Sequence, residues 1–200
     1  MNNIKKISKE PNDDWLWQRF LAGDKQAFGE LMNLHVRTLF HYGSKFSKDK
    51  EFIKDCIQDL FLILWERRNN LSKDIAVKPY LMASLRRHIH RNASQVKVMD
   101  FPREEGVDTF DVEFSVEDRF IANEMSLSQA QRISESLNLL PKRQKEVVYL
   151  KYFQGLDREQ ISDIMEIAPQ TASNLLQMAI RQLKTYWKVE ITLLLMMICG

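Results

Sequence analysis

An acidic segment divides the chain, and this division limits the folds that the chain can adopt more than any other feature. Residues 1–100 hold 18 Lys and Arg against 12 Asp and Glu, residues 101–125 hold 2 against 8, and residues 126–200 hold 9 against 7. The stretch from Asp100 to Glu124 has little helical periodicity and contains Pro, Gly and several Asp residues, which favour turns and loops. We therefore expect two compact units joined by a linker.

Both units are predicted to be helical. The 200 residues include only six Gly and five Pro, and Leu, Ile, Lys, Glu, Gln and Arg, which favour helices, are common. A hydrophobic fraction of 44% and a charged fraction of 28% are ordinary for a globular protein. We predict an all-α fold with small domains at residues 12–98 and 126–188, an acidic linker at 99–125 and an apolar tail at 189–200.

Cysteine usage and the ends of the chain predict a cytoplasmic protein. Cys56 and Cys199 lie far apart without a C-x-x-C spacing, which argues against a disulfide framework or a zinc site. Residues 1–17 lack the apolar core of a secretion signal. The apolar stretch from Ile191 to Cys199 is far shorter than the ~20 residues of a membrane-spanning helix. We interpret it as a packing or docking tail, with membrane-surface contact as the alternative.

Two stripes of side chains mark a helix predicted over residues 51–68, which follows a helix that Asp24 should cap near Lys25. The first stripe has the spacing of a buried face and consists of Ile53, Cys56, Ile57, Leu60 and Leu64. The second mixes carboxylates with large apolar groups and consists of Asp55, Gln58, Asp59, Leu62 and Trp65. Such a mixture fits either internal packing or a partner-binding surface, and composition leaves both open.

A basic helix is predicted to follow, with Pro79 in its first turn. One face carries apolar and aromatic side chains, and the others carry Arg86, Arg87, His90 and Arg91. Like charges four residues apart destabilise an isolated helix slightly, so this cluster suits a position opposite phosphates. A solvated basic face is the alternative. His88 and His90 do not share a helical face, so we predict no metal site.

The C-terminal unit has the pattern of a helix-turn-helix. Asp157 and Gln160 have the spacing of a capping box at the start of a helix of about two turns, after the expected helix end near Gly155. The helix after Pro169 has one apolar face, formed by Ala172, Leu175, Leu176, Ala179, Ile180 and Leu183. In a helix-turn-helix the second helix enters the major groove. The outward polar side chains that could reach base edges are Gln170, Thr171, Ser173, Asn174 and Gln177. An ordinary helical hairpin with a polar face is the alternative.

Together these segments resemble the extracytoplasmic-function group of bacterial sigma factors, the promoter-recognition subunits of RNA polymerase. Similarity to sigma domain two is carried by GDKQAFGELMNLHVRTLFHYGSKF, DCIQDLFLILWERRNNL and KPYLMASLRRHIHRN. Similarity to domain four is carried by LPKRQKEVVYLKYFQGLDREQISDIMEIAPQTASNLLQMAIRQLK. The resemblance implies two small helical domains that act in transcription initiation without enzymatic activity.

The resemblance also implies roles for particular residues. In this family the pattern D-x-x-Q-D-x-F-x-x-x-W docks onto the clamp helices of the large polymerase subunit, and the set here is Asp55, Gln58, Asp59, Phe61, Leu62 and Trp65. The residues expected to contact and help open the −10 element are Tyr80, Arg86, Arg87 and Arg91. The residues expected to read the −35 element are Arg158, Gln170, Thr171, Ser173, Asn174, Gln177 and Arg181.

The chain departs from the family pattern at a few positions. Leu175 and Met178 stand where basic residues are common, and Glu166 occupies a turn position where Gly is usual. Arg87 and Asn92 stand where Asn and an aromatic residue are common. The partners that the resemblance implies are core RNA polymerase, promoter DNA and an anti-sigma protein. It implies no cofactor, no metal and no small-molecule substrate, and a chain that is monomeric when not bound to them.

Two other classes of protein compete with this interpretation. A response-regulator-like transcription factor would share part of the C-terminal pattern, but it needs a receiver domain of alternating strands and helices, and residues 1–100 show helical periods. A helical interaction protein that has lost DNA binding would explain the sparse basic charge of the last helix. An enzyme finds no support, because no Gly-rich phosphate loop, nucleophile elbow or metal-ligand spacing occurs.

Overall fold

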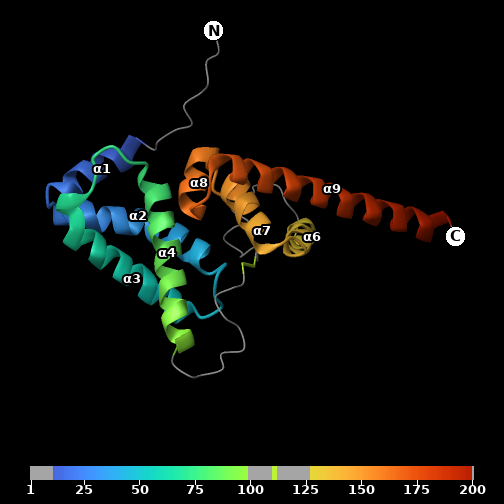
Figure 1. The fold of residues 1–200 in the computed structure, drawn as a ribbon, viewed down its shortest axis with the longest axis horizontal. Helices are drawn as coiled ribbons and strands as arrows, with labels where there is room; N and C mark the ends of the chain where they lie inside the picture. The colour runs from blue at the N-terminus through green and yellow to red at the C-terminus, as the bar shows by residue number, and fades with distance from the viewer. Residues whose placement is uncertain (1–10, 99–109, 112–126, 200) are drawn as a thin grey trace, which may run out of the picture. The chain divides into compact units, whose positions relative to one another are not determined.

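The computed structural model describes the backbone of residues 11–98, 110–111 and 127–199, and the side chains of residues 13–93, 110–111 and 133–186. The chain divides between residues 107 and 108 into two compact units, which are described separately. Within the described ranges the regular elements are all helices (Figure 1). The predicted all-α fold with two helical units is confirmed. The finer boundaries given above stay a prediction.

The described residues of the first unit, 11–98, form four α-helices, which are coloured blue to green in Figure 1. These are α1 (Pro11–Leu21), α2 (Lys25–Gly43), α3 (Lys50–Arg67) and α4 (Val77–Val98), with a short 3-10 turn at Arg68–Asn70. Helix α1 packs on α2, and α2, α3 and α4 pack on one another. The sequence analysis did not predict α1, which buries Leu16, Trp17 and Phe20. These side chains lie at i, i+1 and i+4, so they form one apolar face.

The core of the first unit follows the predicted stripe of α3. All five of its members are buried, so this prediction is confirmed. Close approach of the helices requires Gly43, the last residue of α2. A Cβ atom there would lie 2.8 Å from Cγ2 of Ile53 in α3 and 3.5 Å from atoms of Leu85 and Ile89 in α4. Any side chain at this position would therefore clash with Ile53 and disturb the packing of α2 on α3.

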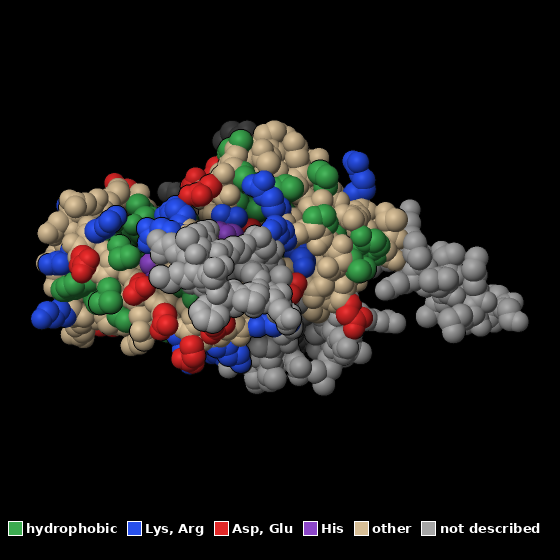
Figure 2. Space-filling model, turned by 60° about the horizontal axis from the view of Figure 1, so that its bottom comes forward, with side chains coloured by type: hydrophobic (Ala, Val, Ile, Leu, Met, Phe, Trp, Pro, Cys, Tyr) green, Lys and Arg blue, Asp and Glu red, His purple; other side chains and the backbone are tan. Residues whose placement is uncertain are grey.

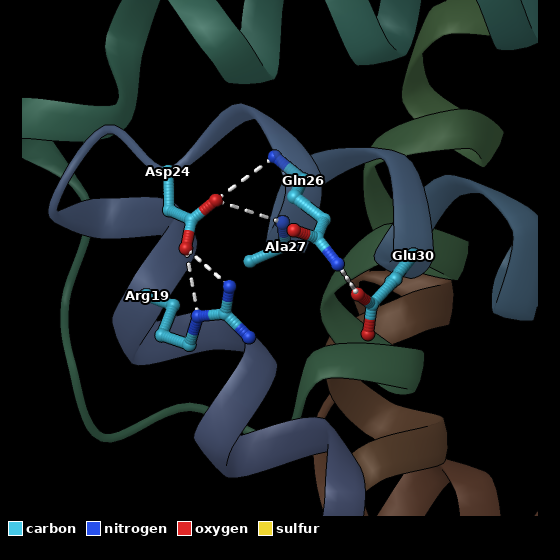
Figure 3. A network of polar contacts seen from close by, with 5 residues as sticks. All are labelled: Arg19, Asp24, Gln26, Ala27 and Glu30. Carbon is cyan, nitrogen blue, oxygen red and sulfur yellow. Dashed lines mark hydrogen bonds and ion pairs between the residues drawn. The ribbon is translucent and has the colours of Figure 1, made fainter.

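Asp24 caps α2, as predicted (Figure 3). Its Oδ1 accepts hydrogen bonds from the backbone N–H groups of Gln26 and Ala27 at 2.9 and 3.2 Å, and its Oδ2 accepts one from Nε of Arg19 at 2.7 Å. Glu30 then accepts a hydrogen bond from the Gln26 amide at 3.1 Å. The Ala27 N–H group, followed by Arg19, holds the pKa of the Asp24 carboxyl below its ordinary value, since each stabilises the ionised form.

The second unit is built around a long C-terminal helix. Its elements are α6 (Leu127–Asn138), α7 (Lys142–Val148), a π-helical turn at Tyr149–Phe153, α8 (Arg158–Met165) and α9 (Pro169–Cys199). Helix α9 packs on α6, α7 and α8. The predicted inward residues of α8, Ile161, Ile164 and Met165, are buried. Gly155 has a φ of 69° just after the π-helical turn, which is the conformation expected where glycine ends a helix.

Two residues of the predicted linker are part of the packing of the second unit, which corrects the view of a simple connector at these positions. Phe110 is 2% exposed, and its ring lies edge-on to Tyr149 with centroids 5.9 Å apart. Asp111 accepts a hydrogen bond from Nζ of Lys145 at 3.1 Å. The buried Phe110 ring and the ion pair beside it, of which the Lys145 side chain is buried and the Asp111 side chain is partly exposed, hold this point of the segment on the unit. The rest of the predicted linker lies outside the described residues.

The apolar tail continues α9, whose backbone is helical as far as Cys199. The side chains of residues 187–200 lie outside the described part of the chain, so both interpretations of the tail stay predictions. Among the described helices, none combines the length and the apolar character that crossing a bilayer requires.

Candidate functional site

Helix α3 presents an exposed face that mixes acidic, polar and apolar groups. Asp55, Gln58, Asp59 and Leu62 are all exposed, and Leu62, a large apolar side chain, is 63% exposed. Their spacing of i, i+3, i+4 and i+7 places them on one side of the helix. Figure 2 shows that hydrophobic side chains lie between red and blue charged groups on the described surface. At these four positions the second stripe is therefore surface and not internal packing.

The aromatic members of the predicted docking set lie deeper. Trp65 is half-buried, with its ring centroid 5.0 Å from that of Phe28 and 4.4 Å from the guanidinium carbon of Arg68. Phe61 is only 2% exposed, and its ring lies edge-on to Phe28 at 6.2 Å. Phe61 is thus a core residue that supports the α3 face from beneath. A side chain that is buried in this way cannot touch a partner. The predicted role of Phe61 as a contact residue is therefore corrected to that of a core residue.

Asp59 is joined to α4 by a buried histidine. Nε2 of His88 lies 3.3 Å from Oδ2 of Asp59, and Nδ1 of the same ring lies 3.0 Å from a terminal guanidinium nitrogen of Arg91. His88 is 8% exposed, whereas Asp59 and Arg91 are exposed. In the sequence, His88 was considered only as a possible metal ligand, and its contact with Asp59 was not predicted. No local pattern reveals a contact between residues 29 positions apart.

A groove of about 390 Å³ lies between α3 and α4. Its lining includes three of the four residues predicted for the −10 element, Tyr80, Arg87 and Arg91, together with His88 and Arg67. Arg86 is half-buried and does not line it. The start of α4 is also held by α1, because the ring of Trp17 lies 5.9 Å from that of Tyr80. The groove combines cations, an aromatic ring and apolar walls, a mixture that suits nucleotides.

The helix-turn-helix of the second unit is formed by α8, the turn after it and the start of α9. Asp157 and Gln160 form the predicted capping box, with hydrogen bonds of 2.8 and 3.0 Å. Glu166 ends α8 in the left-handed conformation, with φ 53° and ψ 52°. That conformation favours glycine, which explains why Gly is usual at this position in the family that the sequence resembles.

The start of α9 presents polar side chains above two buried alanines. Ala172 and Ala179 are buried against the rest of the unit, and small side chains allow close helix contact. Nε2 of Gln170 donates a hydrogen bond to Oδ1 of Asn174 at 3.0 Å. Of the residues predicted for the −35 element, Ser173 is half-buried, and the exposed ones are Arg158, Gln170, Thr171, Asn174, Gln177 and Arg181. The structure thus brings most of this set to one surface region.

Charge on this unit is partly neutralised within it. Both Nε and a terminal nitrogen of Arg158 donate to Oε1 of Glu159, and this hydrogen bond is the main reason why the pKa of Glu159 lies below its ordinary value. Met178, where the resembling family commonly has a basic residue, is 53% exposed. At this position the surface of α9 therefore carries an apolar side chain in place of a cation.

Comparisons with known proteins agree with this geometry. Residues 130–183 match the family described as Sigma-70, region 4, a range that contains α7, α8 and the helix-turn-helix. RNA polymerase sigma factor NccH of Alcaligenes xylosoxydans xylosoxydans is 30% identical over 69 residues, which cover 34% of this chain and 37% of that protein. In this match the chain spans a little over a third of its relative.

Similar folds are found among solved structures that include both units. CnrH, solved in complex with the cytosolic domain of CnrY, aligns with a TM-score of 0.61 and 16% identity over 89% of this chain and 98% of that one. The sigma factor RpoE of Bartonella quintana, solved with the anti-sigma factor NepR, aligns with a TM-score of 0.54 and 19% identity over 81% and 97%. The second unit thus carries the match to sigma-70 region 4, and the chain as a whole is similar in fold to these sigma factors. The resemblance to the extracytoplasmic-function group is confirmed.

The comparisons cover the two units differently. The family match lies wholly in the second unit, whereas the likeness of fold covers most of the chain. The α3 face and the α3–α4 groove therefore lie in the unit that is similar to these sigma factors in fold.

Proposed function

We propose that the chain is a promoter-specificity subunit that binds core RNA polymerase and directs initiation through the −10 and −35 elements. The observation that carries this proposal is the sigma-70 region 4 match over residues 130–183, which contains the helix-turn-helix and its exposed polar side chains. Core RNA polymerase acts on chromosomal promoters, so this proposed partner agrees with the predicted cytoplasmic location of the chain. The chemistry of RNA synthesis belongs to the polymerase, so the chain itself needs neither a catalytic residue nor a cofactor.

The exposed face of α3 is the proposed docking surface for core polymerase. It offers the carboxylates of Asp55 and Asp59, the amide of Gln58 and the apolar side chain of Leu62. Apolar anchors surrounded by polar groups are typical of the centre and rim of protein interfaces. Half-buried Trp65 adds an aromatic edge to this face, and its contacts with Phe28 and Arg68 fix its ring in place before a partner binds.

The α3–α4 groove is the proposed contact for the −10 element. Aromatic rings stack with unpaired bases, and cations attract the phosphates that lie between them. Tyr80 supplies such a ring, and Arg87 and Arg91 supply the cations. Arg86, which is outside the groove lining, takes a supporting role at its edge in this proposal.

The start of α9 is the proposed reader of the −35 element. Amide and hydroxyl groups at the N-terminal end of a recognition helix can form hydrogen bonds with base edges in the major groove. Gln170 and Asn174 are already hydrogen-bonded to each other, so their orientation is partly set before DNA binds. Arg158 and Arg181 lie exposed and supply phosphate contacts in this proposal.

A protein inhibitor is proposed as a further partner. CnrH and RpoE were each solved with a bound protein, the cytosolic domain of CnrY and the anti-sigma factor NepR. The large exposed apolar side chains of the first unit, Trp15, Leu34, Val36 and Leu62, support such an interaction, since exposed apolar groups favour protein contacts. We propose that an anti-sigma protein and core polymerase compete for this chain, which is monomeric without them.

Polymerase binding tests the first half of the proposal. Purified chain is titrated with fluorescently labelled core polymerase, and the Asp59→Ala and Trp65→Ala variants are compared with Leu139→Ala. Leu139 is an exposed apolar residue of the second unit outside the proposed binding surfaces, so its variant controls for loss of surface side chains in general. We expect both α3 variants to weaken binding at least tenfold, as loss of an interface hot spot does, with little change for Leu139→Ala. Unchanged binding of the α3 variants would remove this face from the proposal.

Promoter selectivity tests the second half. Reconstituted holoenzyme is assayed on a promoter and on copies with altered −35 bases, with Gln170→Ala, Ser173→Ala and Asn174→Ala variants. Thr185→Ala is the control, because Thr185 is exposed in the same helix but far from its start. We expect the three variants to lose discrimination between −35 sequences, since each removes a group able to reach base edges. Retained discrimination would exclude these residues as base readers.

A further inference from the structure

Three polar side chains connect the α3 face with the α3–α4 groove. Asp59 belongs to the face that is proposed to dock on polymerase, and Arg91 lines the groove that is proposed to hold the −10 element. His88 lies between them, 3.3 Å from the carboxylate and 3.0 Å from the guanidinium. Each flanking residue is exposed, whereas His88 is buried. The histidine therefore contacts residues of both surfaces, and although it lines the groove it is itself largely buried.

The chemistry of the two neighbours fixes the tautomer of the imidazole. A guanidinium group can only donate hydrogen bonds, so Nδ1 of His88 must accept from Arg91 and carry no proton. An ionised carboxylate can only accept, so Nε2 must carry the proton and donate it to Asp59. The neutral Nε2–H tautomer satisfies both contacts at once. A doubly protonated ring would turn Nδ1 into a donor facing another donor and would break the link to Arg91.

The histidine in this link is buried and attached to the core. His88 is 8% exposed, and its α4 neighbour Ile89 is fully buried, so the backbone under the ring is anchored in the core. Arg91 is three residues further along α4 and Asp59 belongs to another helix. Hydrogen bonds to charged groups contribute more than those between neutral groups, and those made by buried groups are costly to lose. The orientation of each exposed partner thus depends on the other through one ring.

We propose that His88 is a positioning residue that couples the polymerase-docking face to the −10 groove. Its two hydrogen bonds hold Asp59 and Arg91 as one unit, so a change in the position of either side chain is transmitted to the other surface. This inference rests on the proposed function, because it assigns a task to those two surfaces. The expected consequence is that loss of His88 weakens both polymerase binding and promoter opening, although His88 is not part of the exposed α3 face.

The tautomer is tested first, on the full chain without any partner. Nitrogen-15 NMR of the imidazole ring distinguishes a protonated from an unprotonated ring nitrogen, and His88→Gln assigns the signal. At neutral pH we expect Nε2 to be protonated and Nδ1 to have the shift of a hydrogen-bonded acceptor, which Arg91→Met should remove. A neutral Nδ1–H tautomer or an imidazolium would overturn the inference. This experiment uses no polymerase, so its result does not depend on whether the proposed function is correct.

Function is tested with two variants that differ in hydrogen-bonding capacity. His88→Phe keeps a planar ring but makes neither hydrogen bond, whereas His88→Gln can still accept from Arg91 through Oε1 and donate to Asp59 through Nε2. We expect His88→Phe to weaken polymerase binding and promoter opening by roughly tenfold each, the equivalent of one hydrogen bond to a charged group. His88→Gln should recover much of both. Equal defects in the two variants would indicate simple packing and overturn the proposal.

His35 provides a matched control. It is 5% exposed and lies 3.4 Å from the Asp13 carboxylate, so it too is a buried histidine beside an acidic side chain of the first unit, but it contacts neither surface. His35→Phe should lower thermal stability and leave polymerase binding and promoter opening unchanged at a temperature where circular dichroism shows it folded. If it reproduced the binding losses of His88→Phe, general destabilisation would explain them, and the coupling role would be wrong.

A double-mutant cycle measures the coupling itself. Asp59→Asn and Arg91→Met are combined, and promoter opening by the holoenzyme is measured with His88 and again with His88→Phe. With His88 present we expect the effects of the two changes to be non-additive by several fold, as for side chains in one hydrogen-bond network. With His88→Phe, the fold-changes in promoter opening caused by Asp59→Asn and by Arg91→Met should be independent, so that the double variant shows their product. Additivity with His88 present would overturn the inference, whereas failure of the wild-type chain to bind polymerase would count against the proposed function instead.

Discussion

The two units hold their candidate surfaces in different ways. In the first unit, Trp65 and Asp59 are oriented by residues distant in sequence, Phe28 from α2 and His88 from α4. In the second unit, the start of α9 is oriented by local features, which are the Asp157 capping box, the left-handed turn at Glu166 and small alanines on the buried face. The first surface therefore depends on an intact tertiary core, and the second on short-range geometry.

This contrast predicts different sensitivities. A core change in the first unit should disturb its surface through several helices, because aromatic rings from α1, α2 and α3 contact one another. A change at the α8–α9 turn should act mainly through backbone conformation. Unit-specific stability is best followed by amide hydrogen exchange, which reports local opening separately for each region.

The largest effect is expected from Phe61→Ala. Removal of this buried ring leaves a cavity beside Phe28 and should destabilise the first unit by about 3–5 kcal/mol, with loss of polymerase binding. Hydrogen exchange should show faster opening of α2 and α3 and unchanged exchange in α8. The adjacent Leu62 is 63% exposed, so Leu62→Ala should leave stability nearly unchanged. Similar destabilisation by both variants would show that Phe61 is not part of the core.

A smaller effect is expected when a buried alanine of α9 is enlarged. Ala179 is 0% exposed, so Ala179→Leu must push α9 away from its neighbours at a cost of about 1–3 kcal/mol. Denaturant unfolding and hydrogen exchange of α7 and α9 would measure it. The neighbouring Met178 is 53% exposed, and Met178→Leu is the control that should change little. Tolerance of leucine at both positions would contradict the close packing described for this helix.

A change at the turn should act in the opposite direction. Glu166 has a positive φ of 53°, a conformation that costs a non-glycine residue roughly 1 kcal/mol. Glu166→Gly is therefore expected to stabilise the second unit by up to about 1 kcal/mol, seen as slower hydrogen exchange in α8. Glu166→Ala keeps the Cβ atom and should bring no such gain. If alanine stabilised as much as glycine, loss of the carboxylate and not relief of the backbone would be the cause.

The smallest effect concerns the pH dependence of the first unit. The pKa of Asp24 is lowered from an ordinary value of 3.8, so its ionised form stabilises the folded state above that pH. This contribution should disappear as the pH falls below 3.8 and through the lowered pKa. Asn also caps helices, so Asp24→Asn should unfold almost like the wild type near neutral pH but lose less stability on acidification. Parallel pH profiles for the two proteins would show that Asp24 contributes no such pH dependence.

The second unit was easier to predict because its signals are local. The capping box at Asp157, the turn after α8 and the apolar face of α9 are each encoded within a few residues, and the structure contains all three. Even the departure at Glu166, where the family usually has Gly, falls on the one described non-glycine residue with positive φ. Patterns of this kind follow from backbone geometry and need no knowledge of the tertiary fold.

In the first unit, several contacts between helices could not be predicted from local sequence patterns. The helical period identified the buried stripe of α3, but it could not show that Phe28 from α2 covers Phe61, so Phe61 was assigned to the surface set. Helix α1 was not predicted because it is short and only three of its apolar residues are buried. The Asp59–His88 contact and the Phe110 anchor on Tyr149 join residues far apart in the chain. Contacts of that kind depend on how helices pack.

The indole of Trp17 has a consequence for engineering chimeric proteins. Its Nε1 donates a hydrogen bond at 3.0 Å to the backbone carbonyl of Ser72, in the loop between α3 and α4, and its ring contacts Tyr80 just beyond that loop. The loop is thus fastened to a helix more than fifty residues earlier in the chain. Residues 68–80 therefore cannot be exchanged on their own. If this segment were replaced by that of a relative, residue 17 would have to be replaced as well, by the residue that matches the new segment.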